Sequence, residues 1–138
     1  MKLKALSNML KRLRCVESRL TKEFEDKTGF SLTRYEMLIY IRDNGASLQT
    51  DIAKYLEIDP AAVTRHMKAM EDEGYVNRER NKENGREIIV SLTNYAKSEL
   101  EKCKEKQNGN SYELPVPFSQ EEIEELTDIL DKLEKKLD

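Results

Sequence analysis

The chain has 138 residues, of which 38% are hydrophobic and 37% are charged, and its formal net charge at pH 7 is −3. This length suits one compact domain. Dense charge, no tryptophan and few glycines and prolines favour solvated helices over a β-sandwich or a barrel. No apolar run approaches the roughly 20 residues needed to cross a bilayer, and charge interrupts the N-terminus too often for a signal peptide. We therefore expect a mainly α-helical, cytoplasmic protein.

Charge is distributed unevenly along the chain. Residues 1–22 hold seven Lys or Arg against one acid, whereas residues 119–138 hold eight acids against three lysines. With that acidic segment set aside, the other 118 residues have a net charge of +2. A negative total therefore does not exclude a nucleic-acid-binding surface, because local patches determine what a protein contacts.

The first predicted element is a long amphipathic helix that ends at Gly29. Its apolar residues recur at spacings of three and four, with a break at Glu17. They are Leu3, Leu6, Leu10, Leu13, Leu20 and Phe24. We expect residues 1–30 to form an N-terminal dimerisation helix.

Two shorter helices should follow. Thr33 and Glu36 have the spacing of a capping box, which predicts a helix over 33–44 with a left-handed exit at Asn44-Gly45. Leu48, Ile52, Ala53 and Leu56 then share one side of a helix of about nine residues, for which Ser47 is the expected cap.

The stretch DPAAVTRHMKAMEDEGYV, residues 59–76, predicts a fourth helix with a well-marked start. Asp59 is a favourable cap, Pro60 loses no hydrogen bond at the first helical position, and Gly74 ends the helix. Its apolar arc should be buried and holds Val63, Met67 and Met70. The opposite arc holds Ala61, Thr64, Arg65 and Lys68. His66 lies at the edge of the buried arc, which favours a partly buried packing histidine.

An alternating pattern then replaces the helical one. Val76, Arg78 and Arg80 share one parity, and Ile88, Val90 and Leu92 resume the alternation after Asn84-Gly85, a strong turn signal. This pattern predicts a two-stranded β-hairpin with a charged tip.

Two further helices complete the chain. Thr93 should cap a helix with Ala96, Leu100 and Cys103 on its apolar side, broken by QNGN at 107–110. SYELPVPF, residues 111–118, reads as an extended connector because each proline disfavours helix before it. Ser119 and Glu122 form a second predicted capping box. The last helix carries a continuous apolar stripe of Ile123, Leu126, Leu130, Leu133 and Leu137.

A short helix, a tight turn, a sharply capped helix and a hairpin follow one another in the order of a winged helix-turn-helix. Small residues such as Ala61 and Ala62 would allow close approach in a major groove about 12 Å wide. Arg65 is the leading candidate for guanine readout, and Arg86 for the minor groove. The expected DNA-binding residues are Ser47, Gln49, Thr50, Pro60, Ala61, Ala62, Thr64, Arg65, Lys68, Arg78, Arg80, Lys82 and Arg86.

The runs LTRYEMLIYI, LQTDIAKYLEIDPAAVTRHMKAMEDEGYVNRER and NGREIIVSLT together resemble the MarR family of winged-helix transcription regulators, over about residues 31–97. The resemblance implies an obligate homodimer that places each recognition helix in a major groove and each wing in a minor groove. By position, Ala61, Ala62, Thr64, Arg65 and Lys68 fall on the family's recognition helix, and Arg86 on its wing arginine. The resemblance also implies a repressor released by a small apolar or phenolic effector.

The terminal helices indicate a dimer without reference to the family. A winged-helix lobe over 31–93 does not need them, so a monomer would expose their leucine stripes. A basic first helix and an acidic last helix would complement each other across a two-fold axis. The expected dimerisation residues are Leu3, Leu6, Leu10, Leu13, Ile123, Leu126, Leu130, Leu133 and Leu137, and residues 94–138 form the C-terminal dimerisation helices.

Two other functions are consistent with parts of the sequence. Cys15 lies close to Arg12, Arg14 and Arg19, which suggests a thiol-based redox sensor, although an incidental role is favoured. A winged-helix module for protein–protein interaction is the second alternative. With one histidine, no Gly-rich phosphate loop and no metal-ligand spacing, the sequence predicts no enzyme activity, no metal and no cofactor.

Overall fold

The computed structural model describes residues 1–105 and 116–138. The predicted break at QNGN and most of the predicted connector SYELPVPF lie outside these residues. The elements in chain order are α1 (Leu3–Thr28), α2 (Leu32–Asn44), β1 (Ser47–Leu48), α3 (Gln49–Leu56), α4 (Pro60–Asp72), β2 (Val76–Arg80), β3 (Ile88–Leu92), α5 (Asn94–Glu105) and α6 (Gln120–Leu137). In the described residues, no helix is both long and apolar enough to cross a membrane.

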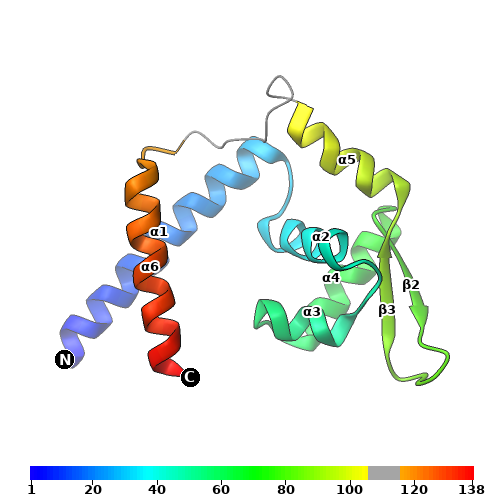
Figure 1. Cartoon of the computed structure of the whole chain (residues 1–138), viewed down its shortest axis with the longest axis horizontal. Coiled ribbons are helices and arrows are strands. Elements are labelled where there is room, and N and C mark those ends of the chain that lie inside the picture. The colour runs from blue at the N-terminus through cyan, green and yellow to red at the C-terminus, as the bar shows by residue number, and fades with distance from the viewer. Residues whose placement is uncertain (106–115) are drawn as a thin grey trace.

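Helices α2, α3 and α4 pack with the sheet into one lobe, from which β2 and β3 project as a wing (Figure 1). The fold is therefore the predicted one: a mainly helical winged helix-turn-helix with long terminal helices. Its core combines side chains from all these elements. The fully buried ones are Met37, Leu38, Ile41, Ile52, Val63, Met67, Met70, Val76 and Val90. The three core residues predicted for the fourth helix are thus confirmed.

The wing belongs to a three-stranded antiparallel sheet of order β1-β3-β2, where we predicted two strands. In the β2–β3 register, Val76 lies opposite Leu92, Arg78 opposite Val90 and Arg80 opposite Ile88, so the predicted parity is confirmed. The additional strand places Ser47 opposite Val90.

The third strand also explains why the prediction that Ser47 caps α3 is wrong. Because Ser47 takes part in the β1–β3 ladder, the helix starts later, and Leu48 is its N-cap residue without a side-chain cap. The Ser47 hydroxyl instead donates to the Gly45 carbonyl at 2.7 Å.

Of the other predicted helix ends, the start of α2 differs from the prediction, and the ends of α1 and α2 agree with it. The prediction for Thr33 is wrong, because Ser31 caps α2 and accepts from the Arg34 N–H. The helix starts earlier since the Leu32 N–H finds an acceptor in α1, the Glu25 carboxylate, at 2.9 Å. The predicted ends at Gly29 and Gly45 are confirmed, with φ of 77° and 75°.

Two further predicted caps are confirmed, and one is confirmed only in position. The Thr93 hydroxyl accepts from the Ala96 N–H at 3.0 Å, and Ser119 and Glu122 form the reciprocal capping box of α6. Asp59 is the N-cap residue of α4, but its carboxylate makes no capping hydrogen bond.

A chain of aromatic rings joins α1 and α5 to the lobe. Phe24 of α1 lies 5.1 Å from Tyr35 of α2, and Phe30 lies 6.1 Å from both Tyr35 and Tyr75. Tyr75, just before β2, lies 5.2 Å from Tyr95 of α5. Burial, and then a hydrogen bond with Tyr95, raise the pKa of Tyr75 to about 12. The phenol therefore stays neutral, as a packed ring requires.

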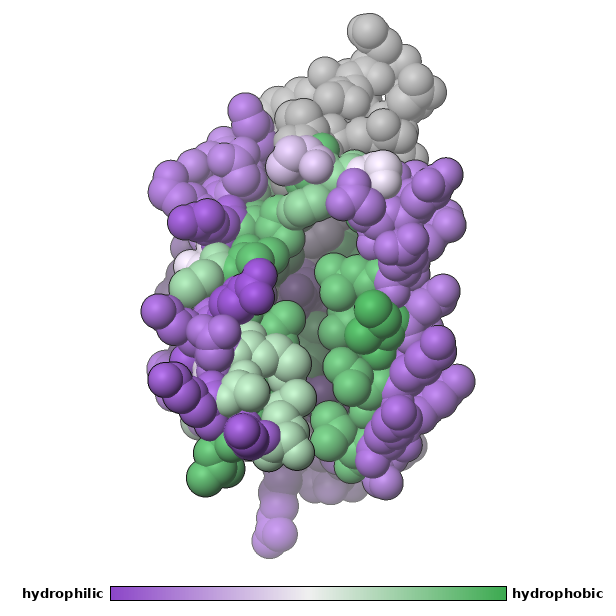
Figure 2. Space-filling view, turned by 90° about the vertical axis from the view of Figure 1, so that its left-hand side faces the viewer, coloured by the Kyte–Doolittle hydropathy of each residue, from purple (hydrophilic) through white to green (hydrophobic). Residues whose placement is uncertain are grey.

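The outer helices expose the apolar stripes that the sequence predicted. No residue of α1 or α6 is fully buried. Leu10 and Leu13 are 43% and 48% exposed, and Leu126 and Leu130 are 49% and 44% exposed. Figure 2, which faces the terminal helices, shows two hydrophobic bands along the molecule with a hollow between them. This surface is far more apolar than water-facing helices require.

Candidate nucleic-acid interface

The outward side of α4 carries small and basic residues, because its other side is held in the core. Ala61, Arg65 and Lys68 are exposed, and Ala62 and Thr64 are half-buried. Within the described residues, no carboxylate forms an ion pair with Arg65 or Lys68. Both cations are therefore available to phosphates or base edges.

The start of α4 is open to an anionic group. Pro60 has no N–H, and the Asp59 side chain caps none of the N–H groups that follow it. Helix N-termini of this kind attract phosphate through their free N–H groups and the helix dipole. Asp59 itself is exposed, so its negative charge opposes that attraction in part.

Two residues expected to bind DNA face the protein interior instead. Gln49 is only 8% exposed: its Nε2 donates to Thr64 Oγ1 at 3.2 Å, and its Oε1 accepts from Arg78 Nε at 3.0 Å. The Arg78 side chain is 16% exposed, with Nη1 3.7 Å from a Glu71 oxygen. In this arrangement Gln49 and Arg78 are occupied by other residues of the lobe. This arrangement favours a role inside the lobe over the direct DNA contact that the sequence predicted for them.

The wing tip is ordered by its own polar groups. Arg80 Nη1 donates to the Gly85 carbonyl at 2.9 Å, so this arginine braces the tip from within. The Asn81 side chain donates to Glu87, and the Asn84 side chain accepts from the Arg86 N–H. Lys82 and Arg86 are exposed, and no described residue forms an ion pair with either of them.

Acids at the far end of α4 are partly neutralised by arginines from other elements. Glu71 pairs with Arg78, and Glu73 accepts from Arg34 Nη1 at 3.1 and 3.2 Å. Sequence reasoning missed Arg34 and the two acceptors. Arg34 and Glu73 are 39 positions apart, so no helical or strand period relates them.

His66 is a half-buried packing residue, as predicted, and it accepts a hydrogen bond. Its Nδ1 lies 3.5 Å from Arg34 Nε, which donates to it. Burial, followed by the charges of Arg34 and Arg65, lowers the pKa of His66 below its usual 6.5. The ring is therefore neutral at pH 7, as an acceptor from arginine must be.

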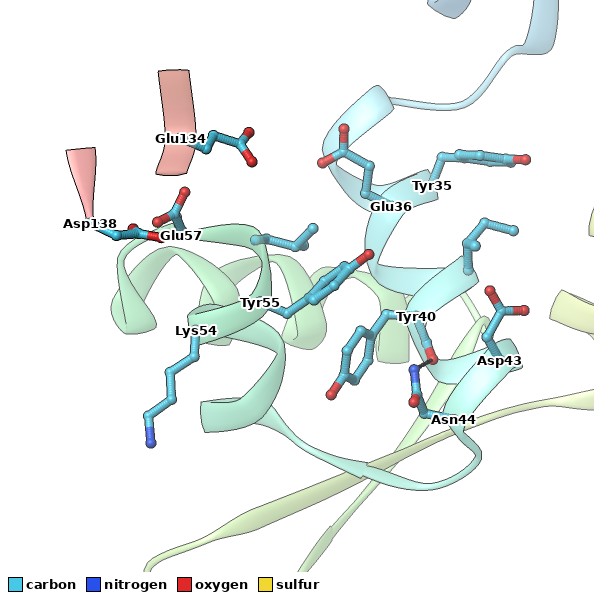
Figure 3. A pocket seen from close by; sticks show the side chains of 12 residues that line it. Tyr35, Glu36, Tyr40, Asp43, Asn44, Lys54, Tyr55, Glu57, Glu134 and Asp138 are labelled. Atoms are coloured by element: carbon cyan, nitrogen blue, oxygen red, sulfur yellow. Dashed lines mark hydrogen bonds between the residues drawn. The ribbon is translucent and has the colours of Figure 1, made fainter. Parts of the chain in front are cut away.

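A cleft of about 1150 Å³ is lined by α2, α3 and the C-terminal end of α6. Figure 3 shows Tyr40 and Tyr55 next to each other on one side of it, with ring centroids 5.0 Å apart. Among the described residues, the lining has a single cation, Lys54. Its carboxylates are those of Glu36, Asp43, Glu57, Glu134 and Asp138. This charge disfavours an anionic ligand.

The comparisons with known proteins match the same part of the molecule. The model of the MarR family matches residues 30–88, from the start of α2 to the wing. The uncharacterized HTH-type transcriptional regulator YdgJ of Bacillus subtilis is 32% identical over 131 residues, which cover 95% of this chain and 80% of that protein. This chain belongs to the MarR family. A second relative of the same organism, the uncharacterized HTH-type transcriptional regulator YwoH, is 32% identical over 96 residues, 70% of this chain and 69% of that protein.

Solved structures share the fold of the whole MarR-family chain. A MarR variant of E. coli, crystallised with operator DNA, superposes with a TM-score of 0.80 at 22% identity and covers 96% of this chain and 99% of its own. Reduced AbfR bound to DNA superposes with a TM-score of 0.76 at 22% identity, covering 98% and 96%. These likenesses extend to the terminal helices and are not confined to the lobe.

We predict a pH-dependent stability that is set by His66, the single histidine of the chain. Its pKa is lower in the folded state, so the unfolded state binds more protons just below pH 6.5. Stability is therefore fully present above pH 6.5 and falls as pH drops through the folded pKa. An NMR titration of the imidazole signal should give a pKa below 6.5.

Replacing Arg34 by Met should move that pKa back toward 6.5, because the repulsive guanidinium is removed. Lys54→Met is the control, since this exposed cation is not among the groups that shift His66. Titration of the Arg34→Met imidazole at or below the wild-type pKa would contradict the role given to Arg34.

Proposed function

We propose that this MarR-family chain regulates transcription as a homodimer that binds a pseudo-palindromic double-stranded DNA operator. Helix α4 enters the major groove, the wing tip enters the adjacent minor groove, and the two half-sites are about one helical turn apart. As a transcriptional regulator it would act in the cytoplasm, and it would act as a repressor.

The observation that supports DNA binding best is the division of cations over the lobe. Arg34 and Arg78 are paired with carboxylates, whereas Arg65 and Lys68 on α4 and Arg86 on the wing are exposed without such partners among the described residues. Basic side chains that form no ion pair within the protein can form contacts with phosphates and base edges.

The proposed interface follows from this division. Arg65 reads a guanine, Arg86 enters the minor groove, and Thr64 and Lys68 contact base edges or phosphates. Lys82 adds a phosphate contact. The residues at the starts of α3 and α4 lie close to the backbone of the duplex, and Arg80 supports the wing tip from its base. These further residues of the proposed interface are Ser47, Thr50, Pro60, Ala61, Ala62 and Arg80.

The dimer is supported by the exposed apolar sides of α1 and α6. Their stripes combine with opposite charge, since the first 22 residues are strongly basic and the last 20 strongly acidic. A second copy would cover both stripes and pair both charges. The proposed organisation is a dimerisation helix over 1–30, a DNA-binding lobe over 31–93 and dimerisation helices over 94–138.

The relatives add support of a different kind. YdgJ and YwoH are named as transcriptional regulators, and the E. coli MarR variant and AbfR have both been crystallised with DNA. A module for protein–protein interaction alone would not need the unpaired cations of α4 and the wing.

The redox alternative is less favoured. Cys15 is exposed on α1, and among the described residues it has no hydrogen bond to Arg12, Arg14 or Arg19. These arginines therefore give its thiolate no direct partner.

A small effector remains part of the proposal. The carboxylates of the cleft in Figure 3 oppose an anionic ligand there, whereas an apolar molecule or a phenol that is neutral at pH 7 is compatible with them.

We predict that Arg65→Ala weakens operator binding by about 1–3 kcal/mol and relaxes specificity at one base pair, because a bidentate guanine contact is lost. Lys82→Ala should weaken all sequences alike and reduce the salt slope, because only a phosphate contact is lost. The operator is first selected from random duplex DNA, and affinities are then measured at several salt concentrations.

Equal effects of the two changes on specificity would show that these roles are wrongly divided. Lys54→Ala serves as a control, since Lys54 lies in the cleft and not on the proposed interface. No preference of the wild-type protein for any duplex, even at low ionic strength, would refute the proposed function.

We predict that Leu130→Lys weakens or abolishes dimerisation, because the charge is placed within the apolar stripe of α6. Asp128→Lys is the matched control: it adds the same side chain to the opposite side of the same helix. Sedimentation equilibrium should give the wild type and this control about twice the chain mass of 16.1 kDa. A wild-type mass of one chain at micromolar concentration would contradict the dimer.

A further inference from the structure

A polar network joins three elements at the base of the wing. It links Gln49 at the start of α3, Thr64 and Glu71 on α4, and Arg78 in the middle of β2. Gln49 is the one polar side chain in the described part of the chain that is buried. Buried polar groups of this kind are costly unless every bond is made, so their geometry is strongly determined.

We propose that Gln49 and Arg78 are positioning residues for DNA binding: they hold the wing at a fixed angle to α4 and orient the hydroxyl of Thr64. This inference rests on the proposed function, because the parts that it positions are the proposed DNA contacts. Neither Gln49 nor Arg78 touches the duplex.

The wing is held through Arg78. Its backbone N–H donates to Glu71 Oε2 at 3.1 Å, its Nε donates to Gln49 Oε1 at 3.0 Å, and its Nη1 lies 3.7 Å from Glu71 Oε1. Strand β2 is thus attached to both α3 and α4 at one residue. A strand rises about 3.3 Å per residue, so a tilt of about 10° at Arg78 moves the region of Arg86, three to four residues along the wing, by about 2 Å. Such a shift is enough to separate a guanidinium from a narrow groove.

Thr64 is oriented through Gln49. The amide oxygen of Gln49 must face the Arg78 Nε–H, because two donors would otherwise oppose each other. The amide nitrogen therefore donates to Thr64 Oγ1. A hydroxyl has one hydrogen, and with its oxygen accepting from Gln49, Thr64 keeps that hydrogen for an acceptor outside the protein. The network makes Thr64 a hydrogen-bond donor toward the duplex.

Two substitutions at Gln49 separate these roles. Gln49→Leu removes both bonds at similar volume and releases the wing. Gln49→Glu retains an acceptor for Arg78, but its carboxylate accepts from Thr64 as well, which turns that hydroxyl inward. The added negative charge of Gln49→Glu weakens DNA binding whether or not a second substitution is present. Its effect therefore cancels when the loss of affinity caused by a second substitution is measured within the Gln49→Glu protein.

The experiment measures operator affinity for Arg86→Ala and Thr64→Val in three backgrounds: wild type, Gln49→Leu and Gln49→Glu. Arg86→Ala should lower wild-type affinity about 10-fold, but Gln49→Leu affinity less than about 3-fold, because a released wing no longer places Arg86 in the groove. In Gln49→Glu the Arg86→Ala cost should remain about 10-fold. The Thr64→Val cost, about 5-fold in the wild type, should disappear in Gln49→Glu.

If Gln49 only stabilised the fold, its substitution would lower the melting temperature or all affinities together. The loss of affinity caused by Arg86→Ala or Thr64→Val would then be the same in every background. Thermal unfolding of every variant tests for a lost fold. If Gln49→Leu does not fold, Arg78→Lys replaces it, since lysine keeps the charge beside Glu71 but lacks the Nε donor to Gln49. The same reduced Arg86→Ala cost is expected.

Equal costs of Arg86→Ala in all backgrounds would overturn the positioning role of the network. A Thr64→Val cost that persists in Gln49→Glu would overturn the assignment of Thr64 as an outward donor. Failure of the wild-type protein to select an operator would refute the proposed function instead, so the two failures are distinguishable.

Discussion

The burial of one side of α4 is the constraint on which the proposed DNA-binding surface depends. Val63, Met67 and Met70 are at most 1% exposed and pack in the core of the lobe. Burying a side chain of this size stabilises a fold by roughly 1.5–3 kcal/mol, so a rotation of the helix about its axis would lose several such contributions. With 3.6 residues per turn, Arg65 and Lys68 are then directed away from the core. The exposure of the proposed reading residues is thus a consequence of packing.

The terminal helices show the opposite balance. They have regular apolar stripes but no fully buried residue. The hydrophobic burial that fixes the orientation of α4 is therefore incomplete for these helices in a single chain. Helix α1 is attached to the lobe partly through the contact of Phe24 with Tyr35, and α5 through the contact of Tyr95 with Tyr75. A second copy that covers the stripes would therefore also set the distance between two lobes, and with it the spacing of two half-sites.

The arginines of the lobe form two groups: those that the folded protein holds, and those that are exposed and proposed to contact DNA. Arg34 and Arg78 lie where carboxylates and neutral acceptors surround them, and they connect elements that are distant in sequence. Arg65 lies on the side of α4 that faces away from the core, and Arg86 lies in the turn between β2 and β3. A guanidinium that is held by the protein defines geometry, whereas an exposed one can exchange water for phosphate.

The sequence by itself determined every described element except β1, and it determined the buried side of α4, because helical and strand periods act over a few residues. It also determined the hairpin, the end of α1 at Gly29 and the capping box of α6, all of which depend on neighbours in the chain. Only the tertiary structure decided the start of α2, the pairing of Ser47 with Val90 and the inward orientation of Gln49 and Arg78. Each of these depends on a partner brought close by folding, and the local period of the sequence holds no information about such a partner.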